Sequence, residues 1–550
     1  MNPDAVDTSA TPLPAPPVSI RDVAWLALVC VVALFLRLPF LEMPMIADEG
    51  GYAYATRGWL EGTGELYGDL WISRPQGIFL LYAAIFETLG TGTVAIRIAA
   101  WMSVCGTAIA VWAIARRWRP APESTVAAMI FVIASGLPSL EGYTANAEIF
   151  MMLPAAWSVW TLLKAIEQSW PARWLIGTGA LVGIATILKP SGFVMYGVVL
   201  VMISVLTRKQ PGRLWLRANA WVGLGLALIG IPTLIHGWYL GWNDFIHATV
   251  TYRLTSQSSV NVPLSEHLAG IWDLAMRVSA VLLLMLIMII VLHRRAIVGQ
   301  FWQLMLRVPD HRAQAVAHQL RLIFRRLPLS TAFRHVAPPN DRIGMILRLW
   351  ILASLVGIAI GGDWWAHYLI QIIAPFAIWF AGMVIDAIRS VRSHTRLALF
   401  AVTVVLLLAP YRVITLGSTE EMSNALFSHP GYQAQDEIAQ WLNENTPPGA
   451  TIYVAFDQAA IYYLADRPPA YRHLYDQELR AIPSSYSDII TIIRSPERPL
   501  YIVSTRQPGP FPDESRAFWQ EVGNYYDLET MIEDIPIYKA RDFNEPAPDA

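Results

Sequence analysis

The sequence predicts a polytopic α-helical membrane protein of about eleven transmembrane helices, followed by a C-terminal α/β domain outside the bilayer. Hydrophobic residues make up 55% of the 550 residues, and charged residues only 15%, against about 25% in soluble domains. The apolar residues come in blocks of about 16–22 residues, long enough to cross a bilayer as helices. After about residue 415 these blocks give way to short alternating runs typical of strands and helices.

The predicted membrane domain covers residues 21–415. Residues 1–20 are rich in proline and alanine and are expected to form a disordered tail. The first block ends without a small-residue cleavage site, which favours a retained signal anchor. Residues 77–90 are too short to span and are expected to lie in the interface. The predicted spans are 23–40, 93–115, 124–140, 149–166, 174–190, 191–207, 218–238, 271–292, 343–360, 369–386 and 397–414.

Lysine and arginine are distributed unequally between the connecting loops, which predicts the orientation. With a cytoplasmic N-terminus, the inner loops include Arg116, Arg117 and Arg119, and the long loop 293–342 carries nine arginines. This loop is expected to form one or two basic amphipathic helices on the inner membrane surface. The outer loops hold only Arg57, Arg74 and Arg253. These outer loops are 41–92, 141–148, 239–270 and 361–368.

An odd number of spans places residues 416–550 on the extracytoplasmic side of the plasma (inner) membrane. Strand-like runs at 450–456 and 499–504 alternate there with helix-like runs, one of which is Gln433–Asn443 before a Pro-Pro-Gly stop. This pattern indicates a small α/β domain.

Several functions are disfavoured by composition. A net charge of −2 gives no overall basic field for nucleic acid. The chain has no Gly-x-x-x-x-Gly-Lys phosphate loop, no zinc-type Cys/His cluster and no Gly-x-Ser-x-Gly elbow. Cys30 and Cys105 both fall inside apolar blocks and are interpreted as small buried hydrophobic residues.

The first outer loop, 41–92, contains the greatest concentration of charged and aromatic residues that could take part in catalysis. Asp48 and Glu49 follow the first span by about eight residues, which places two carboxylates at the outer membrane surface. A poorly solvated carboxylate takes up a proton more readily, as a general base must. The alternative is that Asp48 serves only as a helix N-cap. Two adjacent acids also leave a divalent cation possible, although they are weak evidence for a metal site.

Cations from four separate segments are predicted at the same depth. Arg74 precedes Pro75, and Lys189 precedes Pro190 between two apolar blocks. Arg97 lies early in the second span, and His367 precedes the tenth. Each can contact a lipid phosphate, whereas snorkelling is the alternative for the two arginines.

Further polar and aromatic groups are expected to line an outer cavity with these cations. Trp364 and Trp365 suit either a sugar platform or the aromatic belt of a membrane interface. The remaining candidates for the substrate cavity are Tyr52, Tyr54, Tyr67, Asn146, Glu148 and Tyr368.

These residues resemble the GT-C membrane glycosyltransferases, and the nearest branch is the protein O-mannosyltransferase and aminoarabinose transferase (ArnT-like) group. The resemblance covers roughly residues 20–415 and is most specific in the first outer loop. It rests on the segments Ala47-Asp48-Glu49-Gly50-Gly51-Tyr52, Arg74-Pro75, Leu89-Gly90 with Ala95-Ile96-Arg97, Lys189-Pro190 and His367-Tyr368.

The resemblance implies transfer of a sugar, with inversion, from a polyprenyl- or dolichyl-phosphate carrier to an acceptor hydroxyl or phosphate, the acceptor being a glycan, lipid or protein. It implies Asp48 as the base, Arg74 and Lys189 at the lipid phosphate, and Glu148 as a second acid facing the cavity. Arg74-Pro75-Gln76 departs from the usual Lys-Pro-Pro of this family, and Gly50-Gly51 is permissive backbone that suits close approach of a substrate.

Two other functions fit the same sequence. A transporter or lipid flippase also carries charges within the membrane, but no paired repeats are recognisable and the polar residues gather at one face. A non-catalytic scaffold with a binding C-terminal domain is the second alternative. It predicts that Asp48 and Arg74 are dispensable.

Overall fold

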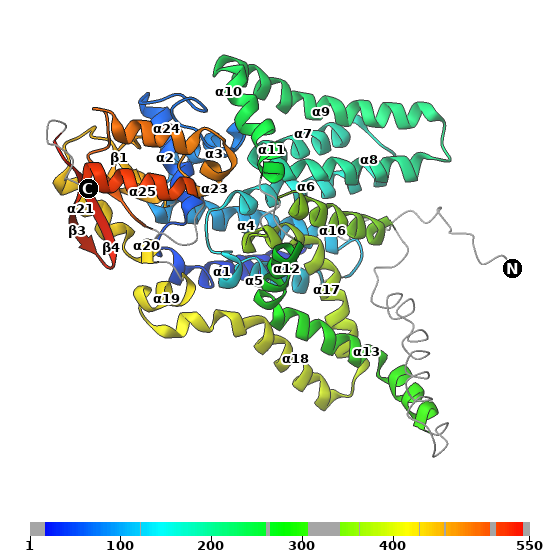
Figure 1. Cartoon of the computed structure of the whole chain (residues 1–550). Helices are drawn as coiled ribbons and strands as arrows, with labels where there is room; N and C mark the ends of the chain where they lie inside the picture. Colours follow the sequence, from blue (N-terminus) through cyan, green and yellow to red (C-terminus); the bar gives the residue numbers. More distant parts are fainter. Residues whose placement is uncertain are drawn as a thin grey trace.

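The computed structural model describes residues 17–120, 123–259, 264–305, 342–361, 364–427, 430–455, 458–505 and 513–542. Most of the predicted tail and residues 306–341 of the predicted inner loop lie outside these ranges. Figure 1 shows the C-terminal strands beside α2 and α3 at one end of the molecule, with the long helices extending away from them.

The membrane domain is built almost entirely from helices. Its helices are α1 (Ile20–Phe35), α2 (Ala47–Glu61), α3 (Gln76–Thr88), α4 (Thr93–Ala115), α5 (Glu123–Ala134), α6 (Ala147–Glu167), α7 (Ala172–Leu188), α8 (Val194–Thr207), α9 (Gly212–Tyr239), α10 (Trp242–Ile246), α11 (Tyr252–Ser259), α12 (Leu264–Arg277), α13 (Ser279–Met305), α16 (Arg342–Gly361), α17 (Ile370–Ser390) and α18 (Ser393–Leu408).

Among the described residues, eight helices are long and apolar enough to cross a membrane, and a ninth span is possible if the bent pair α12–α13 is counted as one. The chain is therefore a multi-pass membrane protein, as predicted. The predicted span 271–292 falls on the bent pair, which turns by 71° at its break. Two other predicted spans, 124–140 and 174–190, fall on the shorter apolar helices α5 and α7.

Local sequence explains where several helices begin and end. Proline precedes the first helical residue of α3, α7 and α9, at Pro75, Pro171 and Pro211. Proline suits a helix start because its fixed φ is compatible with the turn and its missing N–H is not needed there. Gly62 ends α2 in the left-handed conformation, with φ of 69°, which glycine adopts at little cost. The predicted interfacial stretch 77–90 is the short helix α3.

Ion pairs join predicted inner loops at one end of the bundle. Arg119 contacts Asp386 at 2.6 Å, and Arg389 contacts Glu123 at 2.5 Å. These pairs connect the segment after α4 to α17, two elements far apart in the sequence. The contacts place the basic loops together, as the distribution of charge predicts.

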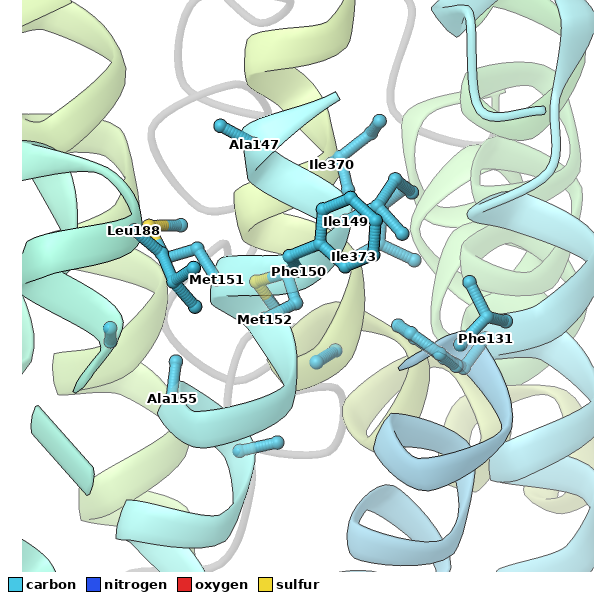
Figure 2. Close-up of a cluster of buried hydrophobic side chains, with 14 of the residues drawn as sticks. Phe131, Ala147, Ile149, Phe150, Met151, Met152, Ala155, Leu188, Ile370 and Ile373 are labelled. Carbon is cyan, nitrogen blue, oxygen red and sulfur yellow. The ribbon is translucent and has the colours of Figure 1, made fainter. Parts of the chain in front are cut away.

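The interior around the first half of α6 is apolar. Figure 2 shows side chains of α6 from Ala147 to Ala155 packed with Ile370 and Ile373 of α17, Leu188 of α7 and Phe131 of α5. Any charge on the first turn of α6 is therefore surrounded by hydrocarbon and needs a partner close by.

The C-terminal domain contains both helices and a four-stranded sheet, in agreement with the predicted α/β domain. Its sheet has the order β1-β2-β4-β3, with β1 and β2 parallel and the other neighbours antiparallel. Ile452 and Val454 face one helical layer whereas Tyr453 faces the other, the alternation expected of a strand. The elements are α19 (Thr419–Leu426), α20 (Pro430–Gln433), α21 (Gln435–Asn445), β1 (Ile452–Val454), α22 (Ala460–Ala465), α23 (Asp476–Ala481), α24 (Ser485–Arg494), β2 (Tyr501–Val503), α25 (Asp513–Tyr525), β3 (Tyr526–Ile532) and β4 (Ile535–Ala540).

Candidate active site

A polar cavity lies where the membrane domain meets the C-terminal domain. It has about 910 Å³ of empty space, counting its open mouth. All four predicted outer loops contribute to its wall, which supports their placement on one side of the protein. Its lining residues are Ile46, Ala47, Asp48, Ile72, Ser73, Arg74, Glu141, Arg253, Trp365, His367, Tyr368, Tyr432, Tyr475, Asp476, Gln477, Glu478 and Arg480.

The adjacent acids Asp48 and Glu49 occupy different environments at the start of α2. Glu49 is completely buried and accepts two hydrogen bonds from Arg97, at 2.8 and 3.1 Å. It also accepts from the backbone N–H groups of Ile46 and Ala145, at 3.1 and 2.6 Å. Neither Glu49 nor Arg97 lines the cavity.

Arg97 is occupied by this interior network. Besides Glu49, it donates to the carbonyl oxygens of Phe40, Met43 and Pro44 at 2.6, 2.7 and 2.9 Å. Its guanidinium therefore fixes the turn between α1 and α2. This geometry favours a structural role for both Glu49 and Arg97 over the predicted catalytic and phosphate-binding roles.

Asp48 faces the cavity. It is the second residue of α2, whose N-cap is Ile46, so the N-cap interpretation of Asp48 is wrong. Its carboxylate lies 3.5 Å from Arg74 Nη2, and its side chain is 23% exposed against 8% for Arg74. The structure thus brings together the predicted base and the predicted phosphate ligand.

Arg74 is held in place by its neighbours. Its Nε donates to the Tyr52 hydroxyl at 2.9 Å, and the Tyr67 hydroxyl donates to the Arg74 carbonyl at 3.0 Å. Burial alone would lower the pKa of Arg74, but nearby Tyr52 and Asp48 outweigh burial and raise it well above its usual value. Burial also raises the pKa of Tyr52. The Arg74 guanidinium therefore keeps its positive charge. Tyr52 and Tyr67, both predicted as cavity residues, hold Arg74 in place through these hydrogen bonds.

Arg253 is a cavity residue that the sequence analysis used only for orientation. It lies on α11 and donates to the Ser73 hydroxyl at 2.8 Å and to the Ser73 carbonyl at 3.3 Å. It consequently stands beside Arg74, at the same wall. The sequence did contain a signal for Arg253 as a site residue, because it is one of only three lysine or arginine residues in the predicted outer loops.

Glu148, Lys189 and His367 form a second charged cluster next to the cavity. Glu148 is completely buried and pairs with Lys189 Nζ, and His367 Nε2 lies 3.7 Å from Glu148 Oε1. His367 also lies 2.8 Å from Glu141, and Lys189 sits 4.0 Å from the centre of the Tyr368 ring. Glu148 thus neutralises part of the positive charge of Lys189 and His367, the two residues predicted to contact a lipid phosphate.

Five of the six predicted cavity residues lie outside the lining, namely Tyr52, Tyr54, Tyr67, Asn146 and Glu148. Asn146 is the N-cap of α6 and accepts from the Ala147 N–H at 2.8 Å. Tyr54 lies on α2 beside the C-terminal domain, with its ring 6.0 Å from that of Tyr462. Tyr368 and Trp365 do line the cavity, whereas Trp364 donates to His267 at 3.0 Å.

The C-terminal domain supplies the opposite wall, through the segment Tyr475–Arg480. Sequence reasoning missed these residues because it treated the domain as separate. The Tyr475 hydroxyl donates to the Ala47 carbonyl at 3.4 Å, directly beside Asp48.

The glycine pair after Asp48 and Glu49 explains how the two domains come so close. A Cβ atom at Gly50 would lie 2.3 Å from the Cα of Ala460, and one at Gly51 would lie 1.7 Å from the Tyr475 hydroxyl. The sequence predicted close approach of a substrate here. The group that approaches is instead the C-terminal domain.

The described residues contain no group of three or more His, Cys, Asp or Glu side chains suited to a metal ion. The separate surroundings of Asp48 and Glu49 also remove the shared geometry that a divalent cation would use.

Comparison with known proteins agrees with the fold. Residues 73–236 match the family model described as dolichyl-phosphate-mannose-protein mannosyltransferase. No curated protein sequence matches the chain.

Two kinds of solved structure are similar over most of the chain. ArnT from Cupriavidus metallidurans, solved bound to undecaprenyl phosphate, has a TM-score of 0.56 at 15% identity, over 94% of this chain and 98% of its own. The archaeal oligosaccharyltransferase AglB from Archaeoglobus fulgidus, in complex with an inhibitory peptide and a dolichol-phosphate, has a TM-score of 0.52 at 13% identity. That match covers 95% of this chain and 74% of AglB.

The predicted resemblance is therefore confirmed at the level of the fold: the chain has the architecture of GT-C membrane glycosyltransferases.

Proposed function

We propose that this GT-C-fold membrane protein is a glycosyltransferase that moves a sugar, with inversion, from a polyprenyl-phosphate carrier to an acceptor hydroxyl. The observation that carries the proposal is the contact between Asp48 and Arg74 at the wall of one cavity at the end of the bundle. The acceptor is a hydroxyl of a glycan, lipid or protein. The lipid phosphates held by ArnT and AglB in their solved structures support the choice of donor.

In the proposed reaction, the donor phosphate is held by Arg74 and Arg253, which lie on the same wall. Guanidinium groups bind phosphate oxygens through charge-assisted hydrogen bonds. His367 lines the same cavity and Lys189 packs on the ring of the lining residue Tyr368. Both serve as supporting contacts, with their charge partly balanced by Glu148. Arg97 takes no part, because Glu49 and backbone carbonyls already occupy its donors.

Asp48 is the general base. The acceptor hydroxyl attacks the anomeric carbon while Asp48 removes its proton, and the bond between that carbon and the phosphate oxygen breaks. The leaving phosphate gains negative charge as it departs, and the arginines stabilise that charge in place. One direct displacement inverts the configuration. The cavity would face the extracytoplasmic side, with the N-terminus in the cytoplasm.

The test is a transfer assay with the full chain in proteoliposomes containing donor lipids that carry a radiolabelled sugar. The expected result is label in the acceptor with the wild-type chain and none with Asp48→Asn. Movement of the donor across the bilayer without transfer would instead identify a transporter. If neither activity is found while a binding function survives Asp48→Asn, the chain is a scaffold.

A further inference from the structure

The two walls of the cavity differ in charge. The membrane-domain wall presents Arg74 and Arg253 together with the acids Asp48 and Glu141, whereas the C-terminal wall presents Asp476 and Glu478 from α23. Arg480 also lies on the C-terminal wall, but it pairs with Asp476. Arg74 and Arg253 therefore attract a phosphate to the first wall, whereas the acids of the second wall do not. The second wall suits a neutral part of the substrate.

Glu478 is the notable residue of this wall. It is 2% exposed, and its Oε2 has no hydrogen-bond partner in the described structure. The imidazole of His473 is close by, but its Nδ1 lies 3.8 Å from that oxygen, too far for a hydrogen bond. An unsatisfied buried carboxyl oxygen is costly for folding, so retaining it points to a partner that arrives with the substrate.

The chemistry of Glu478 suits hydroxyl groups. Burial raises the pKa of Glu478 well above its usual value, although backbone hydrogen bonds from Tyr475 and Leu474 act in the opposite direction. Burial therefore favours the protonated carboxyl, which can both donate and accept a hydrogen bond. Trp365 lies on the same cavity with half of its surface exposed, and an aromatic face packs well against the C–H groups of a sugar ring.

The position of Glu478 also suits the transferred group. Its carboxyl interacts electrostatically with both Arg74 and Asp48. A sugar attached to a phosphate at Arg74, with its anomeric carbon near Asp48, would extend toward this residue. A more distant part of the acceptor would not need this position.

We infer that α23 of the C-terminal domain forms the subsite for the donor sugar, with Glu478 hydrogen-bonding its hydroxyl groups and Trp365 packing against its ring. This inference rests on the proposed function, and it makes the C-terminal domain the part of the chain that selects the sugar.

The test separates the sugar from the phosphate. The full chain in nanodiscs is titrated with bare undecaprenyl phosphate and with undecaprenyl-phosphate mannose, glucose and aminoarabinose. Wild type should bind at least one sugar-carrying lipid more tightly than the bare lipid. Glu478→Ala should weaken that binding about tenfold or more, because a buried hydrogen bond to the ligand is lost, and leave bare-lipid binding within about twofold.

Controls keep loss of folding apart from loss of binding. Glu478→Ala also loses the backbone hydrogen bonds that Tyr475 and Leu474 make with this carboxyl, so its thermal midpoint is measured alongside binding. Glu478→Gln, which keeps the side-chain size and an acceptor oxygen, should fold as wild type does and recover most of the binding. Glu497→Ala, at an exposed position of the same domain, should bind every lipid as wild type does.

Three results would overturn the inference: equal loss of bare and sugar-carrying lipid in Glu478→Ala, unchanged binding of both, or no preference for any sugar-carrying lipid in wild type. If wild type binds none of these lipids, the proposed function fails as well. That outcome is recognisable because bare lipid is measured separately.

Discussion

Glu49 and Arg97 form a two-pronged ion pair with no exposed side-chain surface, immediately next to a carboxylate that faces the cavity. The first turn of α2 therefore carries two acids with different surroundings, one buried and one at the cavity. Glu49 anchors the helix to α4, and Asp48 is left to face the cavity. The anchor determines where Asp48 lies.

The anchor should be essential for folding. Glu49→Ala leaves the Arg97 charge buried without its partner, which costs about 3–5 kcal/mol of unfolding free energy. We expect a large fall in the thermal midpoint and in the yield of folded protein. Glu65→Ala, an exposed residue of the same loop, is the control. A normal midpoint for Glu49→Ala would show that the pair is not an anchor.

Asp48→Asn should leave folding intact and remove catalysis. The carboxylate has only a 3.5 Å contact with Arg74, and its partly exposed side chain contributes little packing. Loss of a general base reduces turnover by about 10²–10⁴-fold. The measurement is the initial rate of sugar transfer, alongside thermal midpoint. Wild-type turnover would exclude Asp48 as the base.

Arg253→Ala should weaken donor binding without unfolding the chain. A hydrogen bond to a charged group contributes about 1.5–3 kcal/mol, so affinity for bare undecaprenyl phosphate should fall by roughly 10–100-fold. The exposed Arg412 supplies the matched change, Arg412→Ala, which should bind normally. Equal affinities for the two variants would remove Arg253 from the phosphate site.

Gly51→Ala should disturb the contact between the domains, because its new methyl group would overlap the Tyr475 hydroxyl. Overpacking of this kind costs about 1–3 kcal/mol, despite the better helix propensity of alanine. Gly197→Ala, in α8 with open space around it, should have no such cost. Adding Tyr475→Phe should restore part of the thermal midpoint, and failure to do so would locate the damage elsewhere.

Acid should destabilise the same interface through His473, whose ring lies 4.6 Å from that of Trp71. Burial lowers the pKa of His473 from 6.5 to about 3. Below pH 6.5 the unfolded chain binds a proton that the folded chain does not, so stability falls as pH drops from 6.5 toward 3.

The measurement is the thermal midpoint at pH 7 and pH 5, compared between wild type and His473→Asn. The comparison between variants is needed because Glu478, with its raised pKa, changes stability in the opposite direction over its own range. Wild type should lose more stability on acidification than the variant. An identical loss would mean that His473 titrates normally.

The sequence predicted the class of fold because hydrophobic block length and loop charge are properties of the chain itself. Blocks such as 93–115 and 397–414 coincide with long apolar helices. The sequence also singled out Asp48 and Arg74, because an acid and a cation at a membrane surface are costly unless they have a use, and the structure places both at one cavity wall.

The details that the sequence could not provide depend on tertiary contacts. Nothing in Asp48-Glu49 tells which acid turns inward, because that depends on Arg97 arriving from another helix. Glu478 was missed because its burial arises only when α23 covers the cavity. The Gly50-Gly51 pair was noticed, but its partner lies about four hundred residues later in the chain.

The fit of Ala460 and Tyr475 against that glycine pair limits how such proteins can be recombined. A chimera that joins this membrane half to the tail of a relative would inherit a surface shaped for one particular neighbour. Exchange of tails would therefore succeed only where the incoming tail carries equally small or matching groups at those two contacts. In a library of such hybrids, the yield of folded protein should follow how well these two contacts fit.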